Sequence, residues 1–213
     1  LADLGATVLK IEKPGSGDDT RSWGPPFLKD AAGHDTTDAA YYLGCNRGKQ
    51  SVAIDFTHPE GRQLVIDLAR QADVLVENYK VGGLAKYGLD YASLAPDHPR
   101  LVYASITGFG QTGPYAARAG YDFIIQGMSG FMSVTGERDD LPGGGPQKAG
   151  VAITDIMTGM YGAVAIQAAL AHVERTGVGQ HIDLALFDSA VAMMAVMNMN
   201  YLVGGTPPSR AGN

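Results

Sequence analysis

The chain has 213 residues, with 16 Lys and Arg against 22 Asp and Glu, a net charge of −6, and 45% hydrophobic residues. This length can bury a substantial core, and the composition is that of a globular protein. The acidic balance disfavours a nucleic-acid binder held by bulk charge. A single cysteine, Cys45, excludes an internal disulfide, and no Cys/His spacing predicts a metal site, so we expect a reducing, cytoplasmic location and no metal.

Short runs rich in β-branched residues predict strands in the first half of the chain. They cover 7–12, 51–56, 74–76 and 101–106. Between the second and third runs, Pro59 opens a segment with apolar residues at helical spacing, which predicts a helix of about three turns. Strands alternating with helices predict an α/β fold with a largely parallel sheet flanked by helices. Ligands of such sheets bind beyond the carboxyl ends of the strands.

The second half begins with a glycine-rich loop at 139–150, which is followed by a long apolar stretch. We expect Thr154 to cap a helix that runs from Asp155 to about Arg175 and stops at Gly177. Polar residues interrupt the stretch, and a charge near a bilayer core is costly. The pattern therefore favours a buried helix of a soluble protein over a membrane span.

The two ends of the chain carry weaker signals. Residues 181–187 alternate in polarity as a strand does, and Asp188 is placed to cap a last helix that ends at Gly204. Leu1 to Gly5 has the pattern of a final helical turn closed by glycine, so we expect the chain to be a fragment. Its opening residues give no indication of a signal peptide.

Asp155 is the candidate for chemistry that stands out from the pattern alone. It lies in the first turn of a mostly apolar helix, where the helix dipole favours the ionised carboxylate. An ionised, partly desolvated carboxylate can act as a nucleophile or a base. Acidic residues in first turns also commonly do no more than support the helix end, and the pattern leaves both interpretations open.

Tyr121 and a group of basic residues are further candidates. Small residues surround Tyr121 and Asp122, so the tyrosine hydroxyl could reach an oxyanion; an ordinary half-buried aromatic is the alternative. Basic residues concentrate in the first 90 positions, where they could bind the phosphates of a nucleotide-like ligand or form a solvated face. They are Lys10, Lys13, Arg21, Arg47, Lys49, Lys80 and Lys86.

Several common motifs are missing from the sequence. It contains no P-loop, and no Gly-x-Gly-x-x-Gly follows the first predicted strand. The histidines lack the spacing of a zinc protease, and no serine or cysteine stands in a nucleophile elbow. P-loop, ordinary dinucleotide-binding and hydrolytic-triad functions are therefore disfavoured.

Six segments carry a family resemblance through their order and spacing. They are Leu4–Gly15, Asn46–Asp55, Asp73–Tyr79, Gly120–Asp122, Thr154–Gly159 and Arg175–Gln180. Together they resemble the class III CoA-transferases, which include formyl-CoA transferase, carnitine CoA-transferase and α-methylacyl-CoA racemase. The resemblance implies that 1–213 is part of a Rossmann-like large domain that binds CoA and carries the catalytic residue. It also implies that this domain is incomplete at both ends, with the small C-terminal domain absent.

The resemblance assigns roles to individual residues. Asp155 takes the position of the catalytic aspartate, which attacks the acyl-CoA carbonyl to form a mixed anhydride and is then converted to an aspartyl-CoA thioester. Tyr121 stands where racemase members carry a histidine, which favours a transferase. The positions that line the CoA site are Lys13, Ile54, Thr57, Asn78, Tyr79 and Lys86, with Lys13 and Lys86 meeting the phosphates.

The leading hypothesis is an enzyme that transfers coenzyme A from an acyl-CoA donor to a carboxylic acid. Residues 200–204 resemble dicarboxylate-using members, so a dicarboxylate such as succinate is one expected substrate. The alternatives are an α-methylacyl-CoA racemase or isomerase, and a CoA-binding fragment without turnover. The resemblance further implies a homodimer of the full-length protein, and no nucleic-acid or membrane partner is expected.

Overall fold

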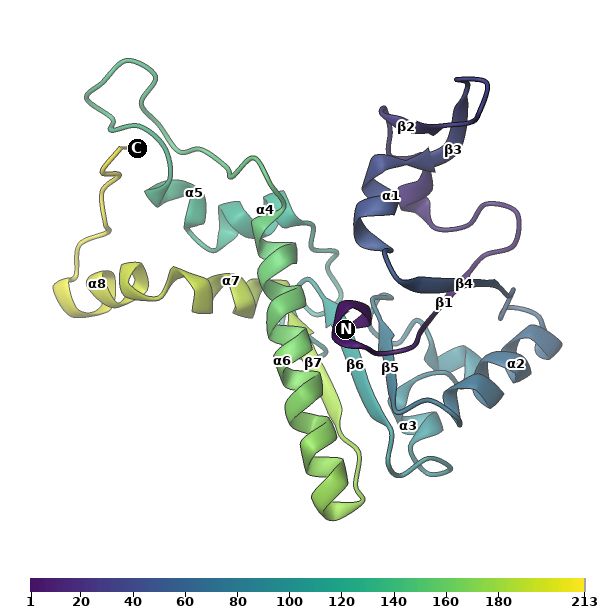
Figure 1. The fold of residues 1–213 in the computed structure, drawn as a ribbon. Coiled ribbons are helices and arrows are strands. Elements are labelled where there is room, and N and C mark those ends of the chain that lie inside the picture. The colour runs from purple at the N-terminus through teal and green to yellow at the C-terminus, as the bar shows by residue number, and fades with distance from the viewer. Residues whose placement is uncertain (213) are drawn as a thin grey trace. The chain divides into compact units, whose positions relative to one another are not determined.

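The computed structural model describes residues 1–212 and has the α/β fold that the sequence predicts (Figure 1). The chain divides into two compact units, the first spanning Leu1–Leu68 and the second beginning at Ala69. The predicted parallel strands are confirmed, and they form a two-stranded sheet in the first unit and a three-stranded sheet in the second.

The first unit contains two short sheets. Strands β1 and β4 pair in parallel from Val8 opposite Lys49 to Glu12 opposite Ala53, while β2 and β3 form an antiparallel hairpin that the sequence analysis missed. The helix predicted at Pro59 is present as α2. The elements are η1 (Ala2–Leu4), β1 (Val8–Glu12), η2 (Asp19–Ser22), β2 (Phe27–Lys29), β3 (Asp35–Ala39), α1 (Ala40–Cys45), β4 (Lys49–Ala53) and α2 (Pro59–Ala69).

The second unit is built on the parallel sheet β5-β6-β7. Helix α6 makes the crossover from β6 to β7, which is the connection that parallel neighbours require. The elements are β5 (Val74–Glu77), η3 (Ala85–Tyr87), α3 (Tyr91–Leu94), β6 (Val102–Thr107), α4 (Asp122–Met128), α5 (Phe131–Val134), α6 (Ile153–Thr176), β7 (His181–Ala185), α7 (Leu186–Met194) and α8 (Val196–Gly204).

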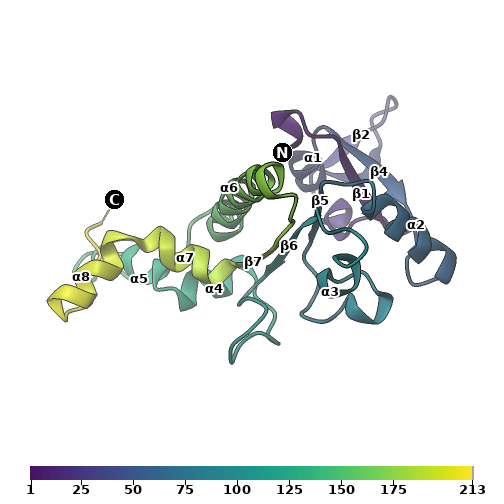
Figure 2. The same ribbon diagram turned by 90° about the horizontal axis from the view of Figure 1, so that it is seen from below.

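The two faces of this sheet are covered differently (Figure 2). Successive side chains of β6 point to opposite faces, so Val102 packs with Ala169 and Val173 of α6. On the other face, the ring of Tyr103 meets Tyr91 of α3 edge to face, with their centroids 5.9 Å apart. All of β6 up to Ser105 is buried, which makes it the central strand of the core.

Helix α6 confirms the predicted long helix and its end at Gly177, which adopts a φ of 75°. The prediction that Thr154 caps it is wrong: Ala152 is the N-cap, and Thr154 lies fully buried in the first turn. The expected burial holds for one face only. The opposite face exposes Ile156, Met160 and Val164 by 52%, 59% and 65%.

Length and hydropathy alone would let α6 cross a membrane, and the bent pair formed by α7 and α8 also passes that test. These criteria also fit the core helix of a soluble protein. Here α6 packs on β6, β7 and α7. This packing follows from the stripe of buried residues along the helix, which comprises Thr154, Thr158, Gly162, Ile166, Ala169 and Val173.

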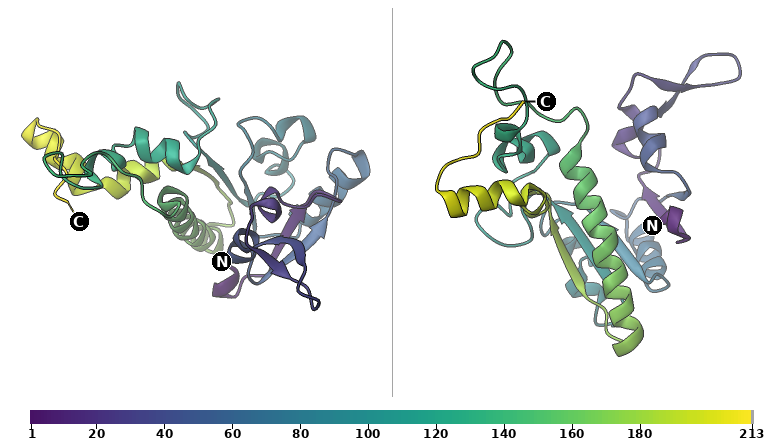
Figure 3. Two further views of the ribbon diagram at one scale, coloured as in Figure 1. Left: turned by 90° about the horizontal axis from the view of Figure 1, so that it is seen from above. Right: turned by 60° about the vertical axis from the view of Figure 1, so that its left-hand side comes forward.

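The predicted last helix is two helices, α7 and α8, bent by 71° (Figure 3). The break occurs at Ala195, which adopts a φ of 40°. The side-chain amide of Asn198 donates to the carbonyl of Val191 at 2.9 Å and so occupies a carbonyl near the break. The expected Asp188 cap is also wrong, because α7 begins directly after β7 and Asp188 lies inside its first turn.

A close backbone approach fixes the segment that leads from β6 to α4. A Cβ added at Gly108 would lie 2.4 Å from the Cα of Gly120, and a Cβ added at Gly120 would lie 2.4 Å from the Cα of Gly108. Neither distance is possible for real atoms without moving the backbone. The contact between Gly108 and Gly120 therefore fixes the position of the backbone that leads into α4.

Candidate active site

Asp155 lies in the first turn of α6, beside a buried carboxylate from another helix. Asp122 opens α4, and its Oδ1 accepts from the Thr154 backbone N–H at 2.8 Å, from the Thr154 hydroxyl at 2.6 Å and from the Asp155 N–H at 3.4 Å. The first N–H groups of a helix have no partner within it. Asp122 therefore supplies across the fold the cap that the sequence analysis assigned to Thr154.

Gln126 connects this cap to the glycine-rich loop. Its side chain is fully buried one turn after Asp122, to which its amide nitrogen donates, while its amide oxygen accepts from the Ala149 N–H at 2.8 Å. Gln126 was not predicted as a site residue, although its four-residue spacing from Asp122 places both on one helix face. The end of the loop, α4 and the start of α6 are thus joined by one series of hydrogen bonds.

The environment of Asp155 differs from the sequence expectation. Desolvation by the surrounding protein, and secondarily the negative charge of Asp122, raise the pKa of the Asp155 carboxyl. The expected preference of the helix dipole for the ionised form is therefore outweighed. Asp155 is nevertheless exposed to solvent. Its carboxylate, which is more basic than usual, can therefore reach and attack a ligand.

Tyr121 directly precedes Asp122 in the chain and therefore lies close to the first turn of α6. It is the N-cap residue of α4, immediately before Asp122, and its side chain is 68% exposed. Its carbonyl accepts from the Ile125 N–H at 3.1 Å, which ties its backbone to a fully buried residue. Because Asp122 contacts Thr154 and Asp155, Tyr121 and Asp155 lie in one region of the second unit.

In the first unit, three predicted CoA-binding residues gather at one edge of the sheet. Lys13 directly follows β1, Ile54 directly follows β4, and these strands are parallel neighbours. The Thr57 N–H and hydroxyl both donate to Asp55, at 2.9 and 2.6 Å. Those bonds lower the pKa of the Asp55 carboxyl, with smaller contributions from nearby cations that include Lys13.

The other three predicted CoA-binding residues lie in the second unit. Asn78 and Tyr79 follow the last residue of β5, Glu77, whose carboxylate accepts from the Tyr79 N–H at 2.7 Å. Lys86 lies in η3, with its ammonium group 4.8 Å from the centre of the Tyr87 ring. All three side chains are exposed and therefore accessible to a ligand.

A cavity of about 250 Å³ lies on the α3 side of the second unit's sheet. The hydroxyl of Ser105 and Nε2 of His181 are 2.9 Å apart in its wall, and the His181 ring stacks on Tyr91. None of the predicted CoA-binding residues lines it. Sequence spacing could not reveal this Ser–His pair, since the two residues are 76 positions apart.

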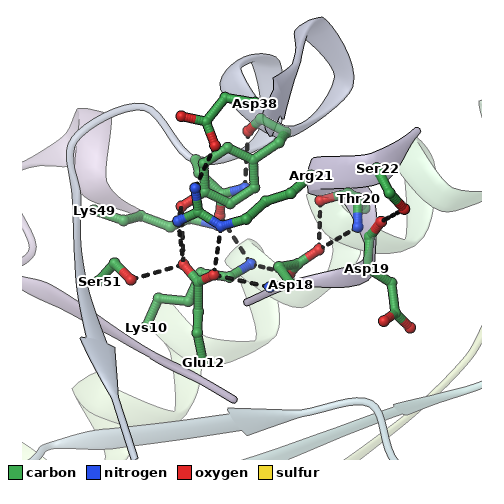
Figure 4. A network of polar contacts seen from close by, with 12 residues as sticks. Lys10, Glu12, Asp18, Asp19, Thr20, Arg21, Ser22, Asp38, Lys49 and Ser51 are labelled. Atoms are coloured by element: carbon green, nitrogen blue, oxygen red, sulfur yellow. Dashed lines mark hydrogen bonds and ion pairs between the residues drawn. The ribbon is translucent and has the colours of Figure 1, made fainter. Parts of the chain in front are cut away.

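The first unit has its own buried carboxylate, Glu12 (Figure 4). Arg21 donates to it from Nε at 2.8 Å and Nη2 at 3.0 Å, and hydroxyls of Tyr42 and Ser51 donate at 2.9 and 2.8 Å. The guanidinium also lies 3.8 Å from the centre of the Tyr42 ring. These donors, Arg21 foremost, hold the pKa of the Glu12 carboxyl far below its usual range.

The comparisons with known proteins agree with this architecture. The model of CoA-transferase family III matches residues 1–213. The chain therefore belongs to CoA-transferase family III, as the resemblance in its motifs predicts. Among residues 1–212, no group of three or more His, Cys, Asp or Glu side chains is arranged to hold a metal ion.

Within this family, the chain is similar to several named proteins. It is 61% identical over 213 residues to succinate–glutarate CoA-transferase of Agrobacterium fabrum, covering 100% of this chain and 52% of that protein. It is 46% identical over 212 residues to the mouse succinyl-CoA:glutarate CoA-transferase, covering 100% of this chain and 46% of that protein. The chain thus spans about half the length of these relatives.

A solved structure supports the same fold. The crystal structure of a CAIB/BAIF family protein from Brucella suis superposes with a TM-score of 0.92 at 57% identity, covering 99% of this chain and 54% of that one. A second structure, Rv3272 from Mycobacterium tuberculosis, gives a TM-score of 0.81 at 34% identity and covers 95% of this chain and 53% of that one.

Proposed function

We propose that the protein carrying this chain transfers coenzyme A from an acyl-CoA donor to a carboxylic acid, with a dicarboxylate as substrate. The observation that carries this proposal is Asp155, an exposed carboxylate of raised basicity at the start of α6. Membership of the family supports the reaction class. The names of the relatives, which contain succinate or succinyl-CoA together with glutarate, support the dicarboxylate.

In the proposed reaction, an oxygen of the Asp155 carboxylate attacks the acyl-CoA carbonyl carbon. The C–S bond breaks and the CoA thiolate leaves, which yields an acyl-aspartyl anhydride. The thiolate then attacks the Asp155 carbonyl carbon, releasing the donor acid and forming an aspartyl-CoA thioester. The acceptor carboxylate attacks this thioester and displaces the thiolate, which finally attacks the new acyl group and restores Asp155. Covalent catalysis of this kind divides one difficult transfer into easier steps.

In this mechanism Tyr121 orients the reacting carbonyl by donating a hydrogen bond and removes no proton from the α-carbon. Its exposure at the start of α4 leaves the hydroxyl free to meet a substrate. A tyrosine O–H is a hydrogen-bond donor, and such donors stabilise the charge that develops on a reacting carbonyl oxygen. Rapid deuterium incorporation from solvent at the α-carbon of a 2-methylacyl-CoA would instead identify a racemase.

The decisive experiment compares Asp155→Asn with Asp188→Asn in the complete gene product. Both are exposed acids in the first turn of a helix, so the pair is matched in position and chemistry. We expect exchange between succinyl-CoA and a panel of carboxylates to vanish only in Asp155→Asn, with CoA binding retained. Hydroxylamine should trap an adduct on the Asp155 peptide of the wild type. Undiminished exchange in Asp155→Asn, or an adduct on Asp122, would refute the assignment.

We propose that Lys13, Ile54 and Thr57 of the first unit, and Asn78, Tyr79 and Lys86 of the second, contact CoA in the complete protein, with the two lysines meeting its phosphates. Replacing both lysines by alanine should weaken CoA binding at low salt, since a charge-assisted hydrogen bond contributes about 1.5 to 3 kcal/mol. Lys29→Ala, an exposed lysine on β2, is the control and should leave CoA affinity unchanged. Calorimetric titration with CoA measures both, and equal affinities of the double variant and wild type would contradict the placement.

We also propose that the complete protein is a cytoplasmic homodimer. Apolar side chains exposed on α6 and α8 support association, among them Val164 at 65% and Leu202 at 71% exposure. The exposed thiol of Cys45 suits a reducing compartment. Light scattering on the complete gene product should give twice the protomer mass, and a monomer would contradict the proposal.

A further inference from the structure

We propose that Asp122 is a positioning residue, which fixes the first turn of α6 and thereby the carboxylate of Asp155. Gln126 extends this function by tying Asp122 to the end of the glycine-rich loop. The inference rests on the proposed role of Asp155 as nucleophile. It assigns Asp122 no bond to substrate.

The geometry that carries the inference is the convergence of donors on one carboxylate. Asp122 is 6% exposed, and its Oδ1 accepts from both the N–H and the hydroxyl of Thr154 and from the N–H of Asp155. Its Oδ2 accepts from Gln126. Because the Asp155 N–H points at the same oxygen as the Thr154 donors, the backbone from which the nucleophile projects is held at Asp122.

The loop is included because Gln126 has both ends of its amide engaged. The nitrogen donates to Asp122 and the oxygen accepts from the Ala149 N–H at 2.8 Å. A side chain with 0% exposure that bridges two segments transmits displacement between them, since it has no solvent-filled space in which to relax. Movement of the loop end would therefore reach the first turn of α6.

Asp122 also acts on Asp155 through its charge. Helix α6 packs against α4, α7, β6 and β7, whose charged or titratable groups are Asp122, Asp188, Tyr103, His181 and Asp183. In the described part of the chain, Asp122 is the one whose field shifts Asp155, and it raises the pKa of that carboxyl. A neutral residue at 122 should therefore lower the pKa of Asp155 and make the carboxylate less basic.

The test uses variants of the complete gene product. Asp122→Asn keeps the size of the side chain and removes its charge, and we expect kcat to fall by about 10- to 100-fold, as misplacement of a reacting group does. The acid limb of the rate profile should move to lower pH. Asp122→Glu keeps the charge, so its acid limb should stay at the wild-type pH. Asp183→Asn removes a carboxylate that also accepts from a backbone N–H, that of Gln111, and should change neither quantity.

A readout without turnover separates this inference from the proposed function. Carboxyl-carbon NMR of the substrate-free protein reports the pKa of Asp155 directly, and Asp122→Asn should lower it. If Asp155→Asn still exchanges CoA, the proposed function fails while the NMR titration still decides whether Asp122 acts on Asp155. An unchanged Asp155 titration in Asp122→Asn together with kcat within twofold of wild type would overturn the inference.

Substitutions at Thr154 test the hydrogen bonds if Asp122→Asn does not fold. Thr154→Val preserves shape but removes the hydroxyl that donates to Asp122 at 2.6 Å, whereas Thr154→Ser keeps a hydroxyl. We expect kcat to fall in the valine variant and to recover in the serine variant, with the acid limb of both at the wild-type pH. Equal activity of the two variants would contradict positioning by Asp122.

Discussion

Among the described residues, each of the two units buries one carboxylate, and the two carboxylates have different partners. Glu12 receives a guanidinium together with hydroxyl and N–H donors, so its charge is cancelled where it stands. In the described part of the chain, Asp122 has no cationic partner and receives hydrogen bonds from N–H and O–H groups of Thr154, Asp155 and Gln126. The charge of Glu12 is balanced by the guanidinium of Arg21. The charge of Asp122 is hydrogen-bonded but not balanced by a cation, so it still raises the pKa of Asp155. The first carboxylate is therefore placed to stabilise the fold, and the second to act on the proposed nucleophile, Asp155.

The largest effect should follow from removing the charge at Glu12. Glu12→Gln breaks the ion pair with Arg21, whose side chain is 25% exposed and keeps Asp38 as a second partner, so we expect a loss of about 2 to 3 kcal/mol of unfolding free energy, the upper range for hydrogen bonds to a charged group. Urea denaturation measures the loss. Asp19→Asn, an exposed acid in the same segment, should change stability by about 0.5 kcal/mol or less. A loss below about 1 kcal/mol in Glu12→Gln would mean that the cluster is not stabilising.

Acid should reveal the same contribution without mutation. The folded pKa of Glu12 lies below its unfolded value, which is about 4.3 for glutamate. Its stabilising contribution is therefore fully present above that unfolded value and is lost as pH falls toward the folded pKa. We expect the wild-type unfolding free energy to drop below about pH 4.3 more steeply than that of Glu12→Gln. Parallel curves for the two proteins would contradict the depressed pKa.

Asp122→Asn should cost less stability than Glu12→Gln. An asparagine keeps one oxygen to accept from Thr154, and no ion pair is broken, so we expect a loss of about 1 to 2 kcal/mol, the range for a weakened helix cap. Urea denaturation at neutral pH measures it beside the first variant. A loss equal to that of Glu12→Gln would remove the distinction between the two carboxylates.

The smallest effect should have the opposite sign. Folding raises the pKa of Asp155, so the folded state disfavours its ionised form, and this penalty is present above the folded pKa and disappears in acid. Asp155→Asn should therefore stabilise the protein at neutral pH, by roughly 0.5 kcal/mol or less for an exposed position. Thermal unfolding at pH 7 and at about pH 2.5, which is well below the ordinary aspartate pKa of about 3.9, should show the gain at pH 7 only. A loss at pH 7 would indicate a supporting helix-end residue.

Much of the fold was predictable because local patterns and packing agree. The β-branched runs and the glycine after residue 176 mark elements whose ends lie within a few residues of the prediction. The broken helix was not predictable, because apolar periodicity continues through Ala195 while its backbone turns to a φ of 40°. The hairpin of β2 and β3 was missed because its residues are mostly exposed and lack alternating hydrophobicity.

The candidate site was predictable in its parts but not in its connections. Motif positions predict Asp155 and Tyr121 as site residues, and that assignment stays a prediction, whereas the bond from Asp122 to Thr154 joins residues 32 positions apart. Spacing along the sequence carries no signal for such a contact. The sign of the Asp155 pKa shift was likewise missed, because it depends on desolvation and on Asp122 more than on the helix that contains Asp155.

The close approach of Gly108 and Gly120 restricts which substitutions these two positions can accept during evolution. A side chain at either position would collide with the Cα of the other glycine, an atom that every amino acid possesses. A second substitution at the partner position cannot compensate for the first, because glycine has no side chain that could be made smaller. A lineage that acquires alanine at one of these positions must shift the backbone that leads into α4. In such a lineage Asp122, which opens α4, would be displaced as well. Selection that preserves the start of α6 therefore also preserves Gly108 and Gly120, although neither glycine lies in α6.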